Sequence, residues 1–96
     1  MMRMHVAVVT YQLKLFGIES LKERRSFVKK LVNRIRKQLN VSVAEIGNCD
    51  SKTSVEIGIA VISSSQKITD SVVRSVTKIV ESTHGAELID YEREQW

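Results

Sequence analysis

Apolar and polar residues alternate along four segments of the chain. In the first segment both sides of the alternation carry apolar residues, which predicts a central strand covered at least partly on both faces. The second and third segments alternate more strictly and flank a turn cluster at residues 47–52, which predicts an antiparallel hairpin. The predicted strands span residues 4–15, 41–46, 53–63 and 86–93.

Two segments between these strands carry apolar residues at helical spacing. From Leu21 to Leu39, six apolar residues lie within one stripe of a helical wheel. From Ile68 to Val80, apolar residues recur at intervals of four, four, three and one, and this spacing outweighs the low helix propensity of the β-branched residues. The predicted helices span residues 20–38 and 66–83.

The ends of the predicted helices carry their own signals. Ser20 can cap the first helix, and Glu23 can reach back to the Ser20 backbone N–H, as in a capping box. Gly17, in the turn before this helix, is available for a positive φ. Gly85 is expected to stop the second helix as the residue after its C-cap.

The predicted order of elements is β-α-β-β-α-β, which indicates an α+β fold of the ferredoxin-like class. Right-handed crossovers place both helices on one face of a four-stranded antiparallel sheet, with the first and third strands in the centre. The 96 residues form a single domain, residues 1–96, and 43% of them are hydrophobic, enough for a core without metals or disulfides.

Nothing in the sequence indicates an oxidising compartment or a membrane. Cys49 is the single cysteine, so no disulfide can form within the chain. The N-terminal apolar run is too short for a signal peptide, and no stretch approaches the roughly 18 apolar residues of a membrane span. We therefore expect a cytoplasmic protein with no membrane partner.

The face of the sheet opposite the helices is a candidate interface. Base stacking by RNA needs aromatic residues on the two central strands, and Tyr11 is the only candidate on the first strand. The small residues on this face instead favour close approach of another layer, so we predict a homodimer that buries it; the alternative is a monomer with an exposed sheet. The residues assigned to this face are Glu56, Gly58, Ala60 and Ile62, with Ala7, Val9, Tyr91 and Trp96 as further contributors.

Positive charge is concentrated on the first predicted helix. The chain carries 15 Lys and Arg against 11 Asp and Glu, and eight of the 15 lie between residues 22 and 37. A basic cluster of this kind favours an anionic partner such as RNA, and the helix start adds free N–H groups that attract phosphate. The alternative is a solvated helix whose cations serve solubility and internal salt bridges. The predicted nucleic-acid contacts are Lys22, Arg24, Arg25, Lys29 and Arg36.

Within this set, Arg24 differs from the others. It lies near the apolar stripe of the wheel, so its stem is expected to pack on the sheet edge while its head reaches the helix start or a carboxylate such as Glu19. Lys22, Lys29 and Arg36 are seven residues apart and share a line beside the stripe. A second group of cations, Lys30, Arg34 and Lys37, lies on the far side.

Signals for catalysis, cofactors and metals are weak. Glu45 and Asp50 could meet across the hairpin and hold a cation, but scattered acids usually face water, and the two histidines have no paired ligand spacing. Acylphosphatases share the fold, but residues 17–25 lack their loop pattern, so this activity would rest on fold analogy alone. We predict a non-enzymatic protein with no catalytic residue, no cofactor and no metal.

Three motifs resemble those of the YlxP-like family of small bacterial proteins, whose function is unknown. The first is S-L-K-E-R-R at residues 20–25, where the family typically has S-L-K-E-K-R; Arg24 replaces a Lys and keeps its charge. The others are N-V-S-V-A-E at 40–45 and G-A-E-L at 85–88, so the resemblance spans nearly the whole chain. It implies a ferredoxin-like fold, and a gene often found among those for translation initiation and ribosome maturation factors. It implies no activity or catalytic residue.

Two functional hypotheses follow. The first is a non-enzymatic module that binds RNA, or a ribosomal particle, through phosphate contacts from the basic helix. The second is a structural or regulatory homodimer whose partner is a protein or a small anionic ligand. The sequence names neither the RNA nor the protein.

Overall fold

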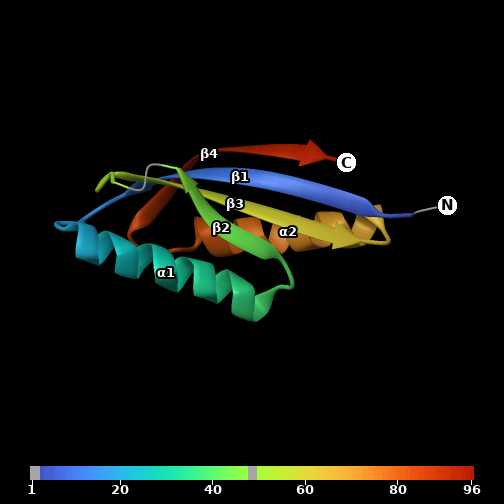
Figure 1. The fold of residues 1–96 in the computed structure, drawn as a ribbon, viewed down its shortest axis with the longest axis horizontal. Coiled ribbons are helices and arrows are strands. Elements are labelled where there is room, and N and C mark those ends of the chain that lie inside the picture. Colours follow the sequence, from blue (N-terminus) through green and yellow to red (C-terminus); the bar gives the residue numbers. More distant parts are fainter. Residues whose placement is uncertain (1–2, 48–49) are drawn as a thin grey trace.

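A computed structural model describes residues 3–47 and 50–96 and confirms the predicted ferredoxin-like order and topology (Figure 1). The antiparallel sheet has the strand order β2-β3-β1-β4, so the first and third strands are central, and both helices cover one face. The prediction that Cys49 lies in a turn falls outside the described residues. The elements are β1 His5–Leu15, α1 Leu21–Gln38, β2 Ser42–Gly47, β3 Ser54–Ser63, α2 Gln66–Glu81 and β4 Ala86–Gln95.

Two of the predicted helix-end details are wrong. α2 ends at Glu81 with Ser82 as its C-cap, so Gly85 does not follow the cap; its φ of 89° serves the turn into β4. Ser20 caps α1 as predicted and accepts a hydrogen bond from the Glu23 N–H at 3.1 Å. The Glu23 carboxylate, however, accepts from the Glu19 N–H at 3.0 Å rather than from Ser20.

The assignment of β1 to the open face of the sheet was inverted. Ala7, Val9 and Tyr11 are 0% exposed and belong to the core between the sheet and the helices. The open face is formed instead by the other side of β1, because Val8 pairs with Ala60 and lies beside the small residues of β3. The prediction failed because both sides of β1 carry apolar residues, so alternation alone could not orient the strand.

A β-bulge in β4 changes which residues of this strand face the helices. Leu13 pairs with Leu88 but Gln12 pairs with Asp90, so Ile89 is an extra residue that shifts the alternation. Tyr91 therefore lies on the helix side, where its ring centroid is 6.1 Å from that of Tyr11. The prediction that Tyr91 contributes to the open face is wrong for this reason.

Tyr11 connects β1 to α2 through a buried hydrogen bond. Its hydroxyl lies 2.7 Å from Thr77 Oγ1, which donates its own proton to the Val73 carbonyl at 2.9 Å, so Tyr11 is the donor to Thr77. Burial raises the pKa of Tyr11 above 10.0. The phenol therefore stays protonated and holds the centre of the sheet to α2.

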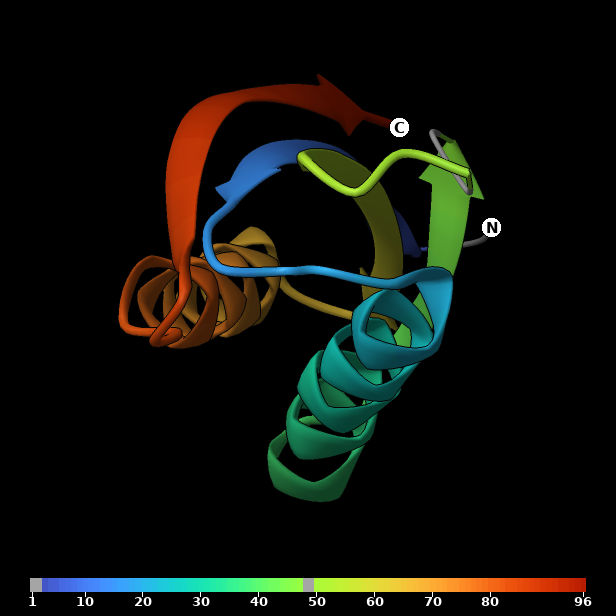
Figure 2. The same ribbon diagram turned by 90° about the vertical axis from the view of Figure 1, so that its left-hand side faces the viewer.

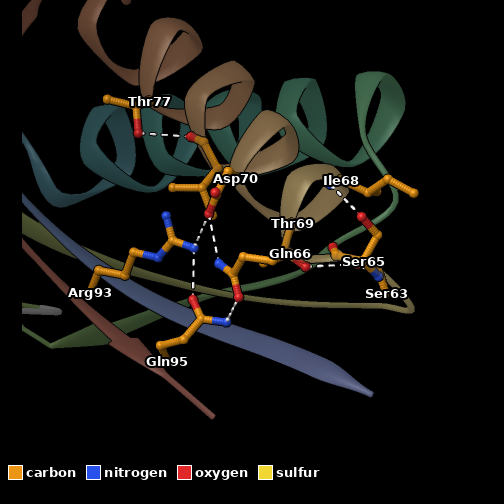
Figure 3. Close-up of polar contacts among 10 residues, drawn as sticks. Ser63, Ser65, Gln66, Ile68, Thr69, Asp70, Thr77, Arg93 and Gln95 are labelled. Atoms are coloured by element: carbon orange, nitrogen blue, oxygen red, sulfur yellow. Dashed lines mark hydrogen bonds and ion pairs between the residues drawn. The ribbon is translucent and has the colours of Figure 1, made fainter. Parts of the chain in front are cut away.

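A second polar network joins the end of β4 to the start of α2 (Figure 3). Arg93 donates to Asp70 Oδ1 at 2.6 Å and to Gln95 at 2.7 Å, while Gln66 donates to Asp70 at 2.8 Å. Gln95 closes the ring with a bond to Gln66 at 2.9 Å. The bulge at Ile89 makes this network possible, because it turns Arg93 and Gln95 toward α2.

The first turns of α1 are fixed by Arg24, whose side chain is 1% exposed. Its guanidinium forms an ion pair of 2.5 Å with Glu45 on β2, and also donates to the carbonyl oxygens of Ser51 and Ser54. The Ser51 and Ser54 carbonyls belong to the connection into β3 and to its first residue. One side chain of α1 thus binds both strands of the β2–β3 hairpin, so Arg24 sets where the helix begins relative to the sheet.

Removing one partner of the Arg24–Glu45 pair should destabilise the fold. Glu45→Ala leaves a buried guanidinium without its carboxylate, and we expect the free energy of unfolding to fall by about 3 kcal/mol. The single variant Arg24→Ala and the double variant Arg24→Ala/Glu45→Ala complete the cycle. The double variant removes both charges, so its loss should be smaller than the sum of the two single losses. Urea unfolding of the four proteins measures this coupling; strict additivity would show that the pair does not couple α1 to the hairpin.

The Asp70 network should make stability depend on pH. A hydrogen bond from Arg93, and a smaller effect from Gln66, hold the pKa of Asp70 below its usual value of 3.8. Ionised Asp70 therefore stabilises the fold at pH values above the pKa that it has in the unfolded chain. This stabilisation is lost as pH falls through the lower folded pKa. Asp70→Asn should therefore be less stable than wild type at pH 7, and the difference should shrink as pH falls through the folded pKa of Asp70. Asp90→Asn is the matched control, and an equal effect of both changes would contradict the assignment.

Candidate nucleic-acid interface

Four of the predicted cations form an outer row along α1. Lys22, Arg25, Lys29 and Arg36 are all exposed, and by helical spacing they lie on one side of the buried stripe of the helix. Within residues 3–47 and 50–96, the ion pairs are Arg24–Glu45 and Arg93–Asp70, so no carboxylate neutralises the outer row. These four side chains remain available to an external anion.

Arg36 shows where the outer row lies in the fold. Its guanidinium donates to the backbone carbonyl of Val43 at 3.1 Å, and Val43 belongs to the edge strand β2. The outer row therefore runs beside β2, on the outer flank of the molecule and away from α2. The bond also occupies a carbonyl of an edge strand, which protects that edge from pairing with another strand.

The prediction that Arg24 contacts nucleic acid is corrected by its burial. Its guanidinium is enclosed among Glu45, Ser51 and Ser54, and a phosphate could reach it only after the helix had separated from the hairpin. The carboxylate that its guanidinium reaches is Glu45 rather than Glu19. Arg24 is a structural residue and is removed from the predicted interface.

The start of α1 offers less to an anion than its sequence indicates. The Glu23 carboxylate folds over the helix start and accepts from the Glu19 N–H, while Ser20 Oγ accepts from the Glu23 N–H. A phosphate at this position would have to displace a carboxylate that already uses the favourable end of the helix dipole. The outer row, rather than the helix start, is the stronger candidate.

Charge is distributed unevenly between the two edges of the molecule. α1 contains eight of the 15 Lys and Arg and a single acid, Glu23. On the opposite edge, β4 pairs Asp90, Glu92 and Glu94 with the open-face side of β1. An anionic strand would therefore be attracted to α1 and repelled by the β4 edge of the open face.

The residues on the far side of α1 line a groove that the sequence analysis did not identify. Lys30 and Arg34 lie together with Phe27, Leu31 and the turn residues Thr83 and His84. The sequence signal was present in the spacing of the cations, but nothing in the sequence placed the turn after α2 beside them. The groove lies on the opposite side of α1 from the outer row.

The acids considered for cation binding are Glu45 and Asp50. Glu45 is paired with Arg24, and no group of three or more His, Asp, Glu or Cys side chains forms a metal-binding cluster in the described part of the chain. Within the same residues, neither helix is long and apolar enough to cross a bilayer.

Solved structures with the same fold have low sequence identity to this chain. The de novo designed protein Foldit4 aligns with a TM-score of 0.55 and 12% identity, over 96% of each chain. A putative aminohydrolase from methicillin-resistant Staphylococcus aureus aligns with a TM-score of 0.54 and 13% identity, over 96% of this chain but 28% of its own. These likenesses concern the fold alone.

Sequence comparison gives closer relationships. The uncharacterized protein YlxP of Bacillus subtilis is 34% identical over 68 residues, which cover 71% of this chain and 74% of that protein. A family model described as "Protein of unknown function (DUF503)" matches residues 6–93. The chain therefore belongs to the DUF503 family, and it is similar to YlxP.

Proposed function

We propose that this protein is a small cytoplasmic, non-enzymatic module that binds the phosphate backbone of RNA, in a ribosomal particle, through the outer row of α1. The observation that carries the proposal is the outer row itself: Lys22, Arg25, Lys29 and Arg36 are exposed and without a carboxylate partner among the described residues. The motif resemblance to a family encoded near ribosome maturation factors adds support.

The chemistry of the outer row favours backbone contacts over base recognition. About four turns of α1 separate Lys22 from Arg36 and present the cations along about 21 Å of helix axis. Lys binds phosphate as a point charge and Arg as a fork, and neither contact reads the base sequence. The aromatic residues that would stack bases are absent from the open-face positions of central strands β1 and β3 within the described residues.

RNA binding should depend on salt through the outer row. With four phosphate contacts, the logarithm of the affinity for single-stranded RNA should fall against the logarithm of salt concentration with a slope of about −3. The variant Lys22→Gln/Arg25→Gln/Lys29→Gln should reduce the size of this slope by about 2. Fluorescence anisotropy with labelled rRNA fragments, across a salt series, measures both values.

A matched control exists on the same helix. Lys30→Gln/Arg34→Gln/Lys37→Gln removes the same residue types and the same charge from the far side of α1. It should leave most of the slope intact, since these side chains face away from the outer row. Equal losses in the two variants would indicate non-specific attraction, and absence of salt-sensitive binding by wild type would refute the proposal.

The open face of the sheet supports a second proposal, a homodimer. Ile62 is 61% exposed and Trp96 73% exposed, and by register Trp96 lies beside Val6 on this face. Ile46 covers Gly58, because a Cβ at Gly58 would lie 3.2 Å from Ile46 Cδ1. The close approach expected at Gly58 is thus already made within the chain, and the exposed apolar surface here belongs to Ile46. Such a surface is stabilised by burial against a second copy.

Self-association should be sensitive to charge on this face. Ile62→Glu would place a carboxylate in the contact, and we expect the mass in sedimentation velocity to fall from twice 10.9 kDa to 10.9 kDa. Ile68→Glu, at a residue of similar exposure on α2, should leave the dimer intact. A wild-type monomer at 100 μM, or dissociation by the control, would contradict the proposed interface.

A further inference from the structure

The groove between the two helices is open because the helices diverge. Both ribbon views show α1 descending away from the sheet toward its C-terminal end, so its second half is not covered by α2 (Figure 1, Figure 2). A hollow beside Phe27, Leu31 and the turn at Thr83 and His84 begins the groove. It continues along α1 past Asn33, Lys37 and Gln38.

The floor of this groove is apolar. Leu31 is buried and Phe27 half-buried in the part formed by α1, and the Phe27 ring would lie 3.5 Å from a Cβ at Gly85. Beyond the hollow itself, helical spacing places apolar residues on the side of α2 that leads to Thr83. These residues are Ile79, Val72 and Ile68, and Ile68 is 52% exposed.

The rim of the groove is cationic. Lys30, Arg34 and Lys37 are exposed, and no acid is paired with them within the described part of the chain. They are spaced by four and three residues, so they lie on one side of α1 over about 10 Å of helix axis. Carboxylates at positions i, i+4 and i+7 of a helix lying along α1 would meet these cations.

We propose that the groove docks an acidic amphipathic helix of a partner protein, with its apolar stripe on Phe27 and Ile68 and its carboxylates against Lys30, Arg34 and Lys37. The apolar floor complements the apolar stripe of such a helix, and the row of cations complements its carboxylates. This is the helix-in-groove mode of recognition. A nucleic-acid strand would satisfy the cations but would leave Ile68 and Val72 in contact with water. The observations therefore favour a helix over RNA at this site.

This inference stands apart from the RNA proposal because it uses the other side of α1. By helical spacing the outer row and the groove cations flank the buried stripe on opposite sides, about 120° from it in each direction. One partner would lie next to β2 and the other next to α2. Both could be bound at once.

The test uses a labelled 18-residue peptide with Leu at helical i, i+3 and i+7 spacing and Glu on both flanks. The full chain should bind it, and Lys30→Gln/Arg34→Gln/Lys37→Gln should weaken binding at least tenfold by fluorescence anisotropy. The outer-row variant Lys22→Gln/Arg25→Gln/Lys29→Gln carries the same charge loss and should change the affinity less than twofold. Phe27→Ser should also weaken the affinity, and circular dichroism of each variant verifies that it is folded.

Several results would overturn the inference. A scrambled peptide of equal composition should bind at least tenfold more weakly, and equal binding of the two peptides would show that no helical face is recognised. Absence of binding at 1 mM peptide, or equal losses in the two charge variants, would also reject it. If rRNA fragments displace the peptide and lose more affinity in the groove variant than in the outer-row variant, the groove is a nucleic-acid site instead. Failure of the peptide test leaves the outer-row slope in the RNA measurement unaffected.

Discussion

The buried ion pair between Arg24 and Glu45 is the constraint on which the arrangement of the charged helix depends. An unpaired guanidinium in the core would be costly, so the first turn of α1 can adopt only the position in which Glu45 and the Ser51 and Ser54 carbonyls are within reach. With the helix start fixed in this way, the remaining cations are directed to either side of the buried stripe. A Lys at this position would keep the charge but lose the fork that binds a carboxylate and a carbonyl together. The placement of the exposed cations of α1 therefore depends on the buried charge of Arg24.

The order of the elements could be predicted because apolar periodicity reports burial directly. β1, α1, β2, β3 and α2 all begin within one residue of their predicted positions. It was harder to predict which face of each strand is buried, because β1 is apolar on both sides and its orientation is decided by which side the helices cover. The bulge at Ile89 left no local signal either, since it depends on pairing with β1, which lies far away in sequence. Such features are set by contacts between distant segments, and a single sequence does not display them.

The candidate site, like the fold, could be predicted from the sequence only in part. The exposure of Lys22, Arg25, Lys29 and Arg36 follows from the helical wheel, and the structure agrees with it. The wheel placed Arg24 near the apolar stripe but did not identify its partner, because Glu45 is 21 residues away in the sequence. The groove beside Phe27 was missed for a similar reason: it needs the turn after α2 to lie beside α1. A signal did exist in the spacing of Lys30, Arg34 and Lys37, but its meaning required knowing which side of α1 faces α2.

The geometry also determines how the proposed interactions could combine. Both helices cover one face of the sheet, so a dimer formed through the open face would place the two α1 helices on opposite outer surfaces. A short RNA strand could then contact one outer row but not both, and its salt dependence would report a single subunit. Dimerisation would thus give two RNA-binding sites per dimer without raising the affinity of either site, unless the RNA were long enough to pass around the dimer.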